Sequence, residues 1–208
     1  MQEVYGFMFE KLKLPFAAIY IAAFLCLFVF VSSADAQRVI PSMGVGPHEV
    51  LMFSDYFCPP CNRIDIKAER LMKELLETGK VKITFVDVPF HSATPIYAKY
   101  YLYAVNAKAD SGNVFHVRRI LFDAAQAKRI QKEDALIAYL KEKKIFWKAM
   151  DEKAIFPLLS ALIKEKKVDQ TPTCVIRYPL AGEKKYVGDV EIWDGLMQLK
   201  AMLKAGRK

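Results

Sequence analysis

The pattern of hydrophobic and polar positions predicts strands and helices near both ends of the chain and helices alone in its middle. Residues 49–53 form a short apolar run typical of a buried strand, and residues 62–80 carry apolar side chains at helical intervals up to a Gly79 suited to a left-handed cap. A second strand is expected at residues 81–88. Because strand, helix and strand follow one another in this order, we expect a parallel pair with a right-handed crossover.

The middle of the chain, at about residues 92–167, shows helical spacing and no strand pattern. We interpret its aromatic positions as ordinary core rather than as a substrate groove. Helices are expected at residues 94–109, 113–127, 132–144 and 151–166. The side chains expected in their core are Tyr97, Tyr100, Tyr101, Phe115, Ile120, Leu121, Phe122, Leu136, Leu140 and Leu159.

The sheet pattern returns after this helical segment. Residues 174–178 read as a strand, a turn around Gly182 follows, and residues 185–187 read as the hairpin partner. Residues 192–203 have the spacing of a closing amphipathic helix, and residues 37–48 read as an irregular lead-in with a short edge strand. The chain is therefore predicted to be an α/β protein, with a central mixed sheet flanked by helices and an inserted helical subdomain.

The apolar run at residues 14–31 contains no charge, follows Lys11 and Lys13, and would span about 27 Å as a helix. Residues 1–36 are predicted to be a signal peptide or an N-terminal membrane anchor, and the small residues at 34 and 36 favour cleavage before Gln37. The domain at residues 37–208 is then expected on the oxidising side of a bacterial inner membrane, in the periplasm.

The 208 residues are 53% hydrophobic and 26% charged, enough to bury one core. The net charge of +8 at pH 7 raises the question of a nucleic-acid partner. However, the lysines at residues 141–144 and 164–167 are interleaved with glutamates, which is typical of a solvated helix face. No nucleic-acid partner is expected.

The candidate chemistry lies in the run Cys58-Pro59-Pro60-Cys61, where the first strand passes into the first helix. Two thiols at this spacing can close a reversible disulfide. Unpaired N–H groups and the positive end of the helix dipole favour a thiolate at Cys58, which makes it the attacking sulfur, with Cys61 as the resolving thiol. A zinc half-site has the same spacing, but the chain lacks a second pair of ligands.

The run from Phe53 to Cys61, together with Thr171-Pro172-Thr173, resembles the thioredoxin superfamily and, within it, the DsbA-like exported thiol–disulfide oxidoreductases. The resemblance implies a thioredoxin fold and a cis-proline at Pro172 that places Thr171 beside the dithiol. The backbone of Thr171 is then expected to pair with an extended substrate.

The chain departs from that family between its two cysteines. Pro60 stands where strongly oxidising DsbA proteins have histidine, so it offers no side-chain donor and no backbone N–H to a Cys58 thiolate. We expect a weaker oxidant, with a reduction potential of roughly −270 to −120 mV. Because Pro60 disfavours helical geometry at Pro59, the first helical turn is expected to be looser or to start later.

A second departure is Met52, which stands where DsbA-like sequences often have a buried glutamate that assists proton transfer. Glu49 or Asp55 could substitute through water, although we interpret Asp55 as a strand-end residue that bonds local backbone. His91, just after the second strand, could lie near the site.

Cys174 leaves the predicted mature domain with an odd cysteine. We interpret it as a buried small hydrophobic residue. The alternative is a third redox thiol, or a metal-binding thiol acting with Cys58, Cys61 and His91.

The sequence thus predicts a periplasmic thiol–disulfide oxidoreductase that acts on cysteines of exported proteins and needs no cofactor beyond its own dithiol. A DsbB-like or DsbD-like membrane redox partner would recycle that dithiol. One alternative keeps the fold and reverses the electron flow, as a disulfide reductase of a dedicated pathway such as cytochrome c maturation. Another is a non-enzymatic module of the same fold that binds metal or peptide.

Overall fold

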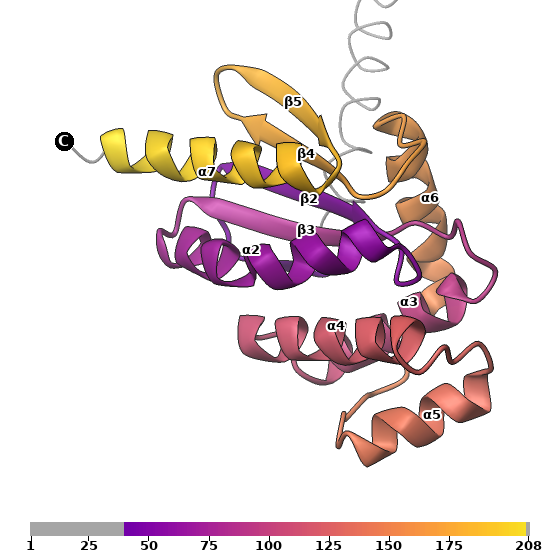
Figure 1. Ribbon diagram of the computed structural model, residues 1–208. Helices are drawn as coiled ribbons and strands as arrows, with labels where there is room; N and C mark the ends of the chain where they lie inside the picture. The colour runs from indigo at the N-terminus through magenta and orange to yellow at the C-terminus, as the bar shows by residue number, and fades with distance from the viewer. Residues whose placement is uncertain (1–39, 207–208) are drawn as a thin grey trace, which may run out of the picture. The chain divides into compact units, whose positions relative to one another are not determined.

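The computed structural model describes residues 40–206, which belong to one compact unit (Figure 1). The expected signal peptide or anchor at residues 1–36 lies outside the described residues. Within residues 40–206, no helix combines the length and the apolar character needed to span a bilayer.

The core of the unit is a five-stranded mixed sheet with the strand order β1-β3-β2-β4-β5. β2 and β3 are parallel, which confirms the pair expected from the strand-helix-strand pattern, and the other neighbouring strands are antiparallel. The central strand β2 is almost entirely buried, and the expected edge strand is the two-residue β1. The strands are β1 (Ser42–Met43), β2 (His48–Ser54), β3 (Val81–Asp87), β4 (Thr173–Tyr178) and β5 (Gly182–Val187).

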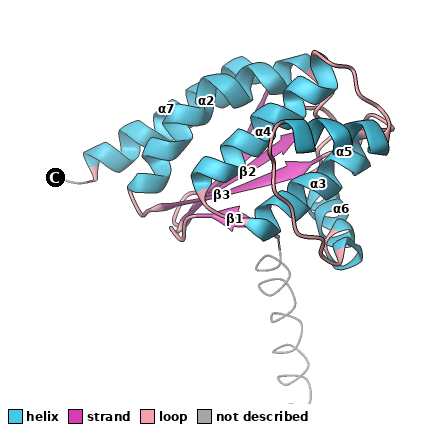
Figure 2. Cartoon of the chain, turned by 90° about the horizontal axis from the view of Figure 1, so that it is seen from below, coloured by secondary structure: helices cyan, strands magenta, loops and turns pink. Residues whose placement is uncertain are grey.

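Helices α2 (Pro59–Glu77) and α7 (Asp189–Ala205) run side by side and pack against each other (Figure 2). Each buries one apolar stripe, as their sequence periodicity predicts. Gly79 follows the end of α2 with φ = +66°, a left-handed conformation that glycine adopts without steric cost. The sequence-based prediction of this helix end is confirmed.

The segment between β3 and β4 is helical, as expected, so the predicted class of an α/β sheet with an inserted helical subdomain is confirmed. Its helices α3 and α6 contact β3, and α4 contacts α2. The expected core side chains of this segment are buried, except that Ile120 is only partly so. The helices are α3 (Thr94–Ala107), α4 (Ser111–Gln126), α5 (Glu133–Glu142), a 3₁₀ turn (Glu152–Ala154) and α6 (Phe156–Glu165).

Candidate active site

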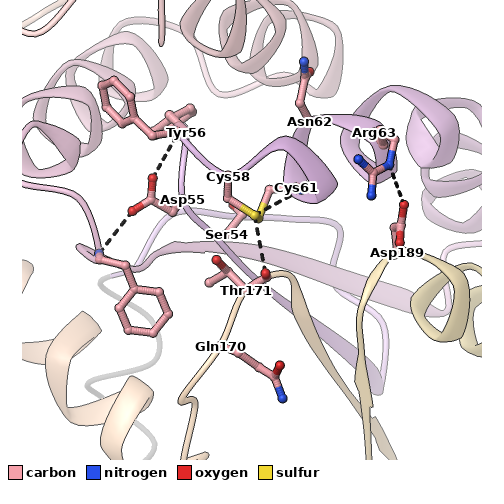
Figure 3. Close-up of a disulfide and its surroundings, with 12 residues drawn as sticks. Ser54, Asp55, Tyr56, Cys58, Cys61, Asn62, Arg63, Gln170, Thr171 and Asp189 are labelled. Atoms are coloured by element: carbon pink, nitrogen blue, oxygen red, sulfur yellow. Dashed lines mark hydrogen bonds and ion pairs between the residues drawn. A yellow bond between two sulfur atoms is a disulfide. The ribbon is translucent and has the colours of Figure 1, made fainter. Parts of the chain in front are cut away.

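Cys58 and Cys61 form a disulfide where the chain leaves β2 and enters α2 (Figure 3). Their Cα atoms are 5.3 Å apart, within the usual range for a disulfide. Cys58 is the residue that caps the helix, with an extended backbone at φ = −90° and ψ = 111°. Cys61 is only 1% exposed, whereas Cys58 is 9% exposed. Cys58 is therefore the more accessible of the two cysteines.

The N-terminus of α2 presents a hydrogen-bond donor to this sulfur. The backbone N–H of Cys61 donates to Cys58 Sγ over 3.3 Å, which is the geometry of a helix N-cap. A charged sulfur gains more from this donor and from the helix dipole than a neutral one does. When the disulfide is reduced, this arrangement favours a thiolate at Cys58.

The expectation that α2 starts later is wrong, because the helix begins at Pro59, directly after Cys58. The first residues of a helix have no intrahelical acceptor for their N–H groups, so prolines at these positions remove no helix hydrogen bond. The helix therefore tolerates both prolines in its first turn, although Pro60 disfavours helical geometry at Pro59. Pro60 still presents no N–H to the sulfur, and the donor comes from Cys61 at the third helical position.

Thr171 lies on the other side of the Cys58 sulfur, just before β4 (Figure 3). The Thr171–Pro172 peptide bond is cis, and the carbonyl oxygen of Thr171 is 3.4 Å from Cys58 Sγ. The sulfur of a disulfide carries no hydrogen, so this is a nonbonded contact in the oxidised state. After reduction, a neutral thiol can donate to this oxygen, whereas a thiolate is repelled by it. Thr171 therefore opposes the thiolate that the Cys61 N–H favours.

Asp55 is fully buried and bonds local backbone, as its sequence position suggested. Its Oδ1 accepts from the N–H of Phe57 over 2.8 Å, and its Oδ2 accepts from the N–H groups of Phe90 and His91 over 3.1 and 3.0 Å. The Thr94 hydroxyl donates to the same Oδ2 over 2.8 Å. Asp55 thus fastens the segment before Cys58 to the segment that follows β3.

His91 does lie in this region, since its Nδ1 is 3.1 Å from Asp55 Oδ1. The centre of its ring is 5.5 Å from the centre of the Phe57 ring. Glu49, the other carboxylate considered as a substitute for a buried glutamate, lies near the start of β2, at the end of the strand away from Cys58. It forms ion pairs with Arg177 at 2.8 Å and with Lys82 at 3.5 Å. The suggestion that Glu49 assists the dithiol is therefore wrong.

Cys174 is completely buried in β4, opposite Met52 of β2. Burial raises the pKa of its thiol well above the usual range, which keeps it neutral. Its interpretation as a small hydrophobic residue is confirmed by this burial. Among the described residues, no three His, Cys, Asp or Glu side chains come together to hold a metal ion, so Cys58, Cys61, Cys174 and His91 do not form the suggested ligand set.

A buried cation that the sequence analysis did not predict lies beside this site. Arg118 of α4 is 1% exposed, its Nε donates to Asp65 Oδ1 over 2.7 Å, and its Nη2 donates to Ser54 Oγ over 3.0 Å. Its Nη1 is 3.7 Å from Asp87 Oδ1, and the guanidinium lies 3.8 Å from the centre of the Phe85 ring. Arg118 therefore connects the inserted helices to α2 and to the ends of β2 and β3.

Burial raises the pKa of Asp87 to about 6, against the lowering effect of Arg118. Burial likewise raises the pKa of Asp65, again opposed by Arg118. Asp87 Oδ2 also accepts a hydrogen bond from the Tyr56 hydroxyl at 3.4 Å. The charge balance of this cluster therefore changes at mildly acidic pH.

The chain matches the family model described as Thioredoxin over residues 45–187. A comparison with curated proteins found no match. Among solved structures, a periplasmic thioredoxin-like protein from Salmonella enterica serovar Typhimurium is 19% identical, with a TM-score of 0.56 over 79% of this chain and 88% of that one. The catalytic domain of Proteus mirabilis ScsC is 22% identical, with a TM-score of 0.57 over 84% and 94% of the two chains. Wolbachia pipientis alpha-DsbA1 is 13% identical, with a TM-score of 0.60 over 83% and 99%. These likenesses show a shared fold.

Proposed function

The chain belongs to the thioredoxin family, and we propose that it is a thiol–disulfide oxidoreductase that exchanges disulfides with cysteines of other proteins through Cys58 and Cys61. The observation that carries this proposal is the disulfide at the N-terminus of α2, with Cys58 the more exposed of the two cysteines. The place of Cys58 at the helix N-terminus makes its thiolate a good leaving group when a second thiol attacks the mixed disulfide. The protein needs no cofactor beyond this dithiol.

In the oxidising direction, a substrate thiolate attacks Cys58 Sγ and forms a mixed disulfide, and the bond to Cys61 breaks. Cys61 leaves as a thiolate and takes up a proton. A second substrate thiolate then attacks the substrate sulfur of the mixed disulfide, and Cys58 leaves as a thiolate. The substrate loses two electrons and two protons overall, and the enzyme gains them as a dithiol.

In the reducing direction, the Cys58 thiolate attacks a substrate disulfide and Cys61 then resolves the mixed disulfide. A specific observation favours this second candidate. The carbonyl of Thr171 opposes a Cys58 thiolate, and Pro60 supplies no donor to stabilise it. A less stable reduced form gives electrons away more readily, which suits a disulfide reductase of a dedicated pathway.

The cellular setting belongs to the same proposal. Residues 1–36 would direct the chain to the bacterial inner membrane, and residues 37–208 would work in the periplasm on exported proteins. A DsbB-like membrane partner would reoxidise the dithiol of an oxidase, and a DsbD-like partner would recharge a reductase. The structural likeness to a periplasmic protein of Salmonella supports this setting.

Trapping of mixed disulfides tests the proposal. The full chain carrying Cys61→Ser should accumulate a mixed disulfide with a peptide that contains one activated disulfide, because the resolving thiol is absent. Cys58→Ser should form none, and Cys174→Ser should exchange like the wild-type chain. Equal trapping by Cys58→Ser and Cys61→Ser would contradict the assignment of Cys58 as the attacking sulfur. No exchange by the wild-type chain would overturn the proposed function.

A further inference from the structure

Gln126 is the last residue of α4, in the inserted helical segment, yet its side chain contacts the segment that carries the dithiol. Its Nε2 donates to the backbone carbonyls of Tyr56 and Cys58, over 3.0 Å in each case. Its Oε1 accepts from the Asn62 side chain over 3.3 Å. This single amide therefore bonds the residues on both sides of the first cysteine.

These contacts determine which way the amide group faces. Both side-chain N–H groups of Gln126 donate to carbonyl oxygens, and its side-chain oxygen accepts from the amide of Asn62. If the amide were turned over, its oxygen would face the carbonyl oxygens of Tyr56 and Cys58. The positive end of the amide dipole is therefore held at the Cys58 carbonyl.

The Cys58 carbonyl also accepts the N–H groups of Cys61 and Asn62, over 3.0 and 3.3 Å. The Cys61 N–H is the group that reaches the Cys58 sulfur. Gln126 thus fixes the position of Cys58 relative to the N–H group that stabilises its thiolate. Its hydrogen bond also draws negative charge away from the backbone carbonyl of Cys58 itself. Both effects favour the reduced, charged form of Cys58.

Resting on the proposed thiol–disulfide exchange, we propose that Gln126 is a positioning residue that makes the Cys58–Cys61 pair more oxidising than the helix N-terminus alone would make it. The inserted helical segment then contributes to the redox chemistry itself. It does so through one hydrogen-bonded side chain at the end of α4.

Substitution of Gln126 in the full chain tests this inference. Gln126→Met keeps the length of the side chain and removes its polar group, whereas Gln126→Glu keeps the shape and replaces the donor with a negative acceptor. Asn113→Leu is the matched control, because Asn113 lies in the first turn of the same helix and its Nδ2 also donates to two backbone carbonyls, those of Ala104 and Lys108. These carbonyls belong to the end of α3 rather than to the active-site loop.

The first readout is the equilibrium of each variant with reduced and oxidised glutathione. We expect Gln126→Met to shift this equilibrium toward the disulfide by about threefold to tenfold, which is about 15 to 30 mV, and Gln126→Glu to shift it further. The second readout is the pH midpoint of Cys58 alkylation in the reduced protein, which should rise in the same order. Asn113→Leu should lower the melting temperature and leave both readouts unchanged.

A purely structural role would lower the stability of the Gln126 variants without moving the equilibrium or the alkylation midpoint, and that result would overturn the inference. An equal shift in Asn113→Leu would overturn it too. If the wild-type dithiol fails to exchange with glutathione at all, the proposed function fails, and this outcome is distinct from a wild-type protein that exchanges and Gln126 variants that match it.

Discussion

The carbonyl oxygen of Thr171 lies 3.4 Å from Cys58 Sγ, although the two residues are 113 positions apart in the chain. The Cys58 sulfur is therefore placed between a donor, the N–H of Cys61, and an acceptor. The balance between these two neighbours sets how readily the dithiol takes up electrons. Because Pro60 has no side-chain donor, the Thr171 carbonyl has the greater influence, and a Cys58 thiolate is less stable.

Pro60→His should make the dithiol more oxidising, because an imidazole at this position can donate to the Cys58 thiolate and, when protonated, attract it. We expect the wild-type reduction potential to lie between roughly −270 and −120 mV and that of Pro60→His to be less negative. Equilibration with glutathione measures both. Pro60→Ala restores only a backbone N–H and should give a smaller shift. An unchanged potential in Pro60→His would contradict this account.

Arg118→Met should destabilise the fold by about 3 to 5 kcal/mol, because it leaves Asp65 and Asp87 buried without their cation. Urea unfolding followed by circular dichroism measures the loss. Arg119→Met is the matched control, since Arg119 is its exposed neighbour and pairs with Glu69 at the surface. This control should cost less than about 1 kcal/mol. Similar losses in the two variants would contradict the role given to the buried cation.

The contribution of Asp87 to stability should fall as the pH rises from about 4 to about 6. Asp87 has an ordinary pKa of 3.8 and a raised pKa of about 6 in the folded chain, so the folded state binds its proton more tightly. The stabilisation is complete below the ordinary value and is lost as the pH rises through the folded one, by roughly 3 kcal/mol in total. Asp65, whose pKa is also raised by burial, contributes in the same direction. Arg118 lowers the pKa of both carboxyl groups and so reduces the effect.

Asp87→Asn should flatten this dependence, because the amide does not titrate. Urea unfolding at several values from pH 4 to pH 7 compares the variant with the wild-type chain. Asp134→Asn, at an exposed position in the first turn of α5, should leave the slope as it is. A wild-type slope that persists in Asp87→Asn would assign the titration to another group.

Cys174 should resist modification in the folded, reduced protein, because its side chain is completely buried and its thiol stays neutral. A maleimide reagent followed by peptide mapping should find Cys58 labelled first and Cys174 labelled only after unfolding in urea. Labelling of Cys174 at the rate of Cys58 in the native protein would revive its interpretation as a third redox thiol.

The sequence predicted the elements well because their signals are local. The apolar run before Cys58, the periodicity of α2 and the left-handed Gly79 each depend on a few neighbouring residues. The start of α2 was missed, because a steric rule for residues before proline was given more weight than the absence of helix acceptors in the first turn.

The charged core was missed for a different reason. Arg118 lies on the same helical stripe as Val114, Leu121 and Phe122, so the periodicity of α4 could have indicated that it is buried. Its partners, however, are far away in the sequence, with Asp65 lying 53 positions before it. Gln126 was missed likewise, because its bonds to the dithiol segment cross from one part of the fold to another.

The single carboxylate of Asp55 has a consequence for how the surface beside the dithiol can be altered. Asp55 holds the backbone of Phe57 on one side and that of Phe90 and His91 on the other, and Phe90 and His91 are about half exposed. The segment around Phe57 and the segment around Phe90 and His91 are therefore not structurally independent. A designer who wishes to change substrate preference by replacing one of these two segments with that of another protein would have to keep Asp55, or replace both segments together.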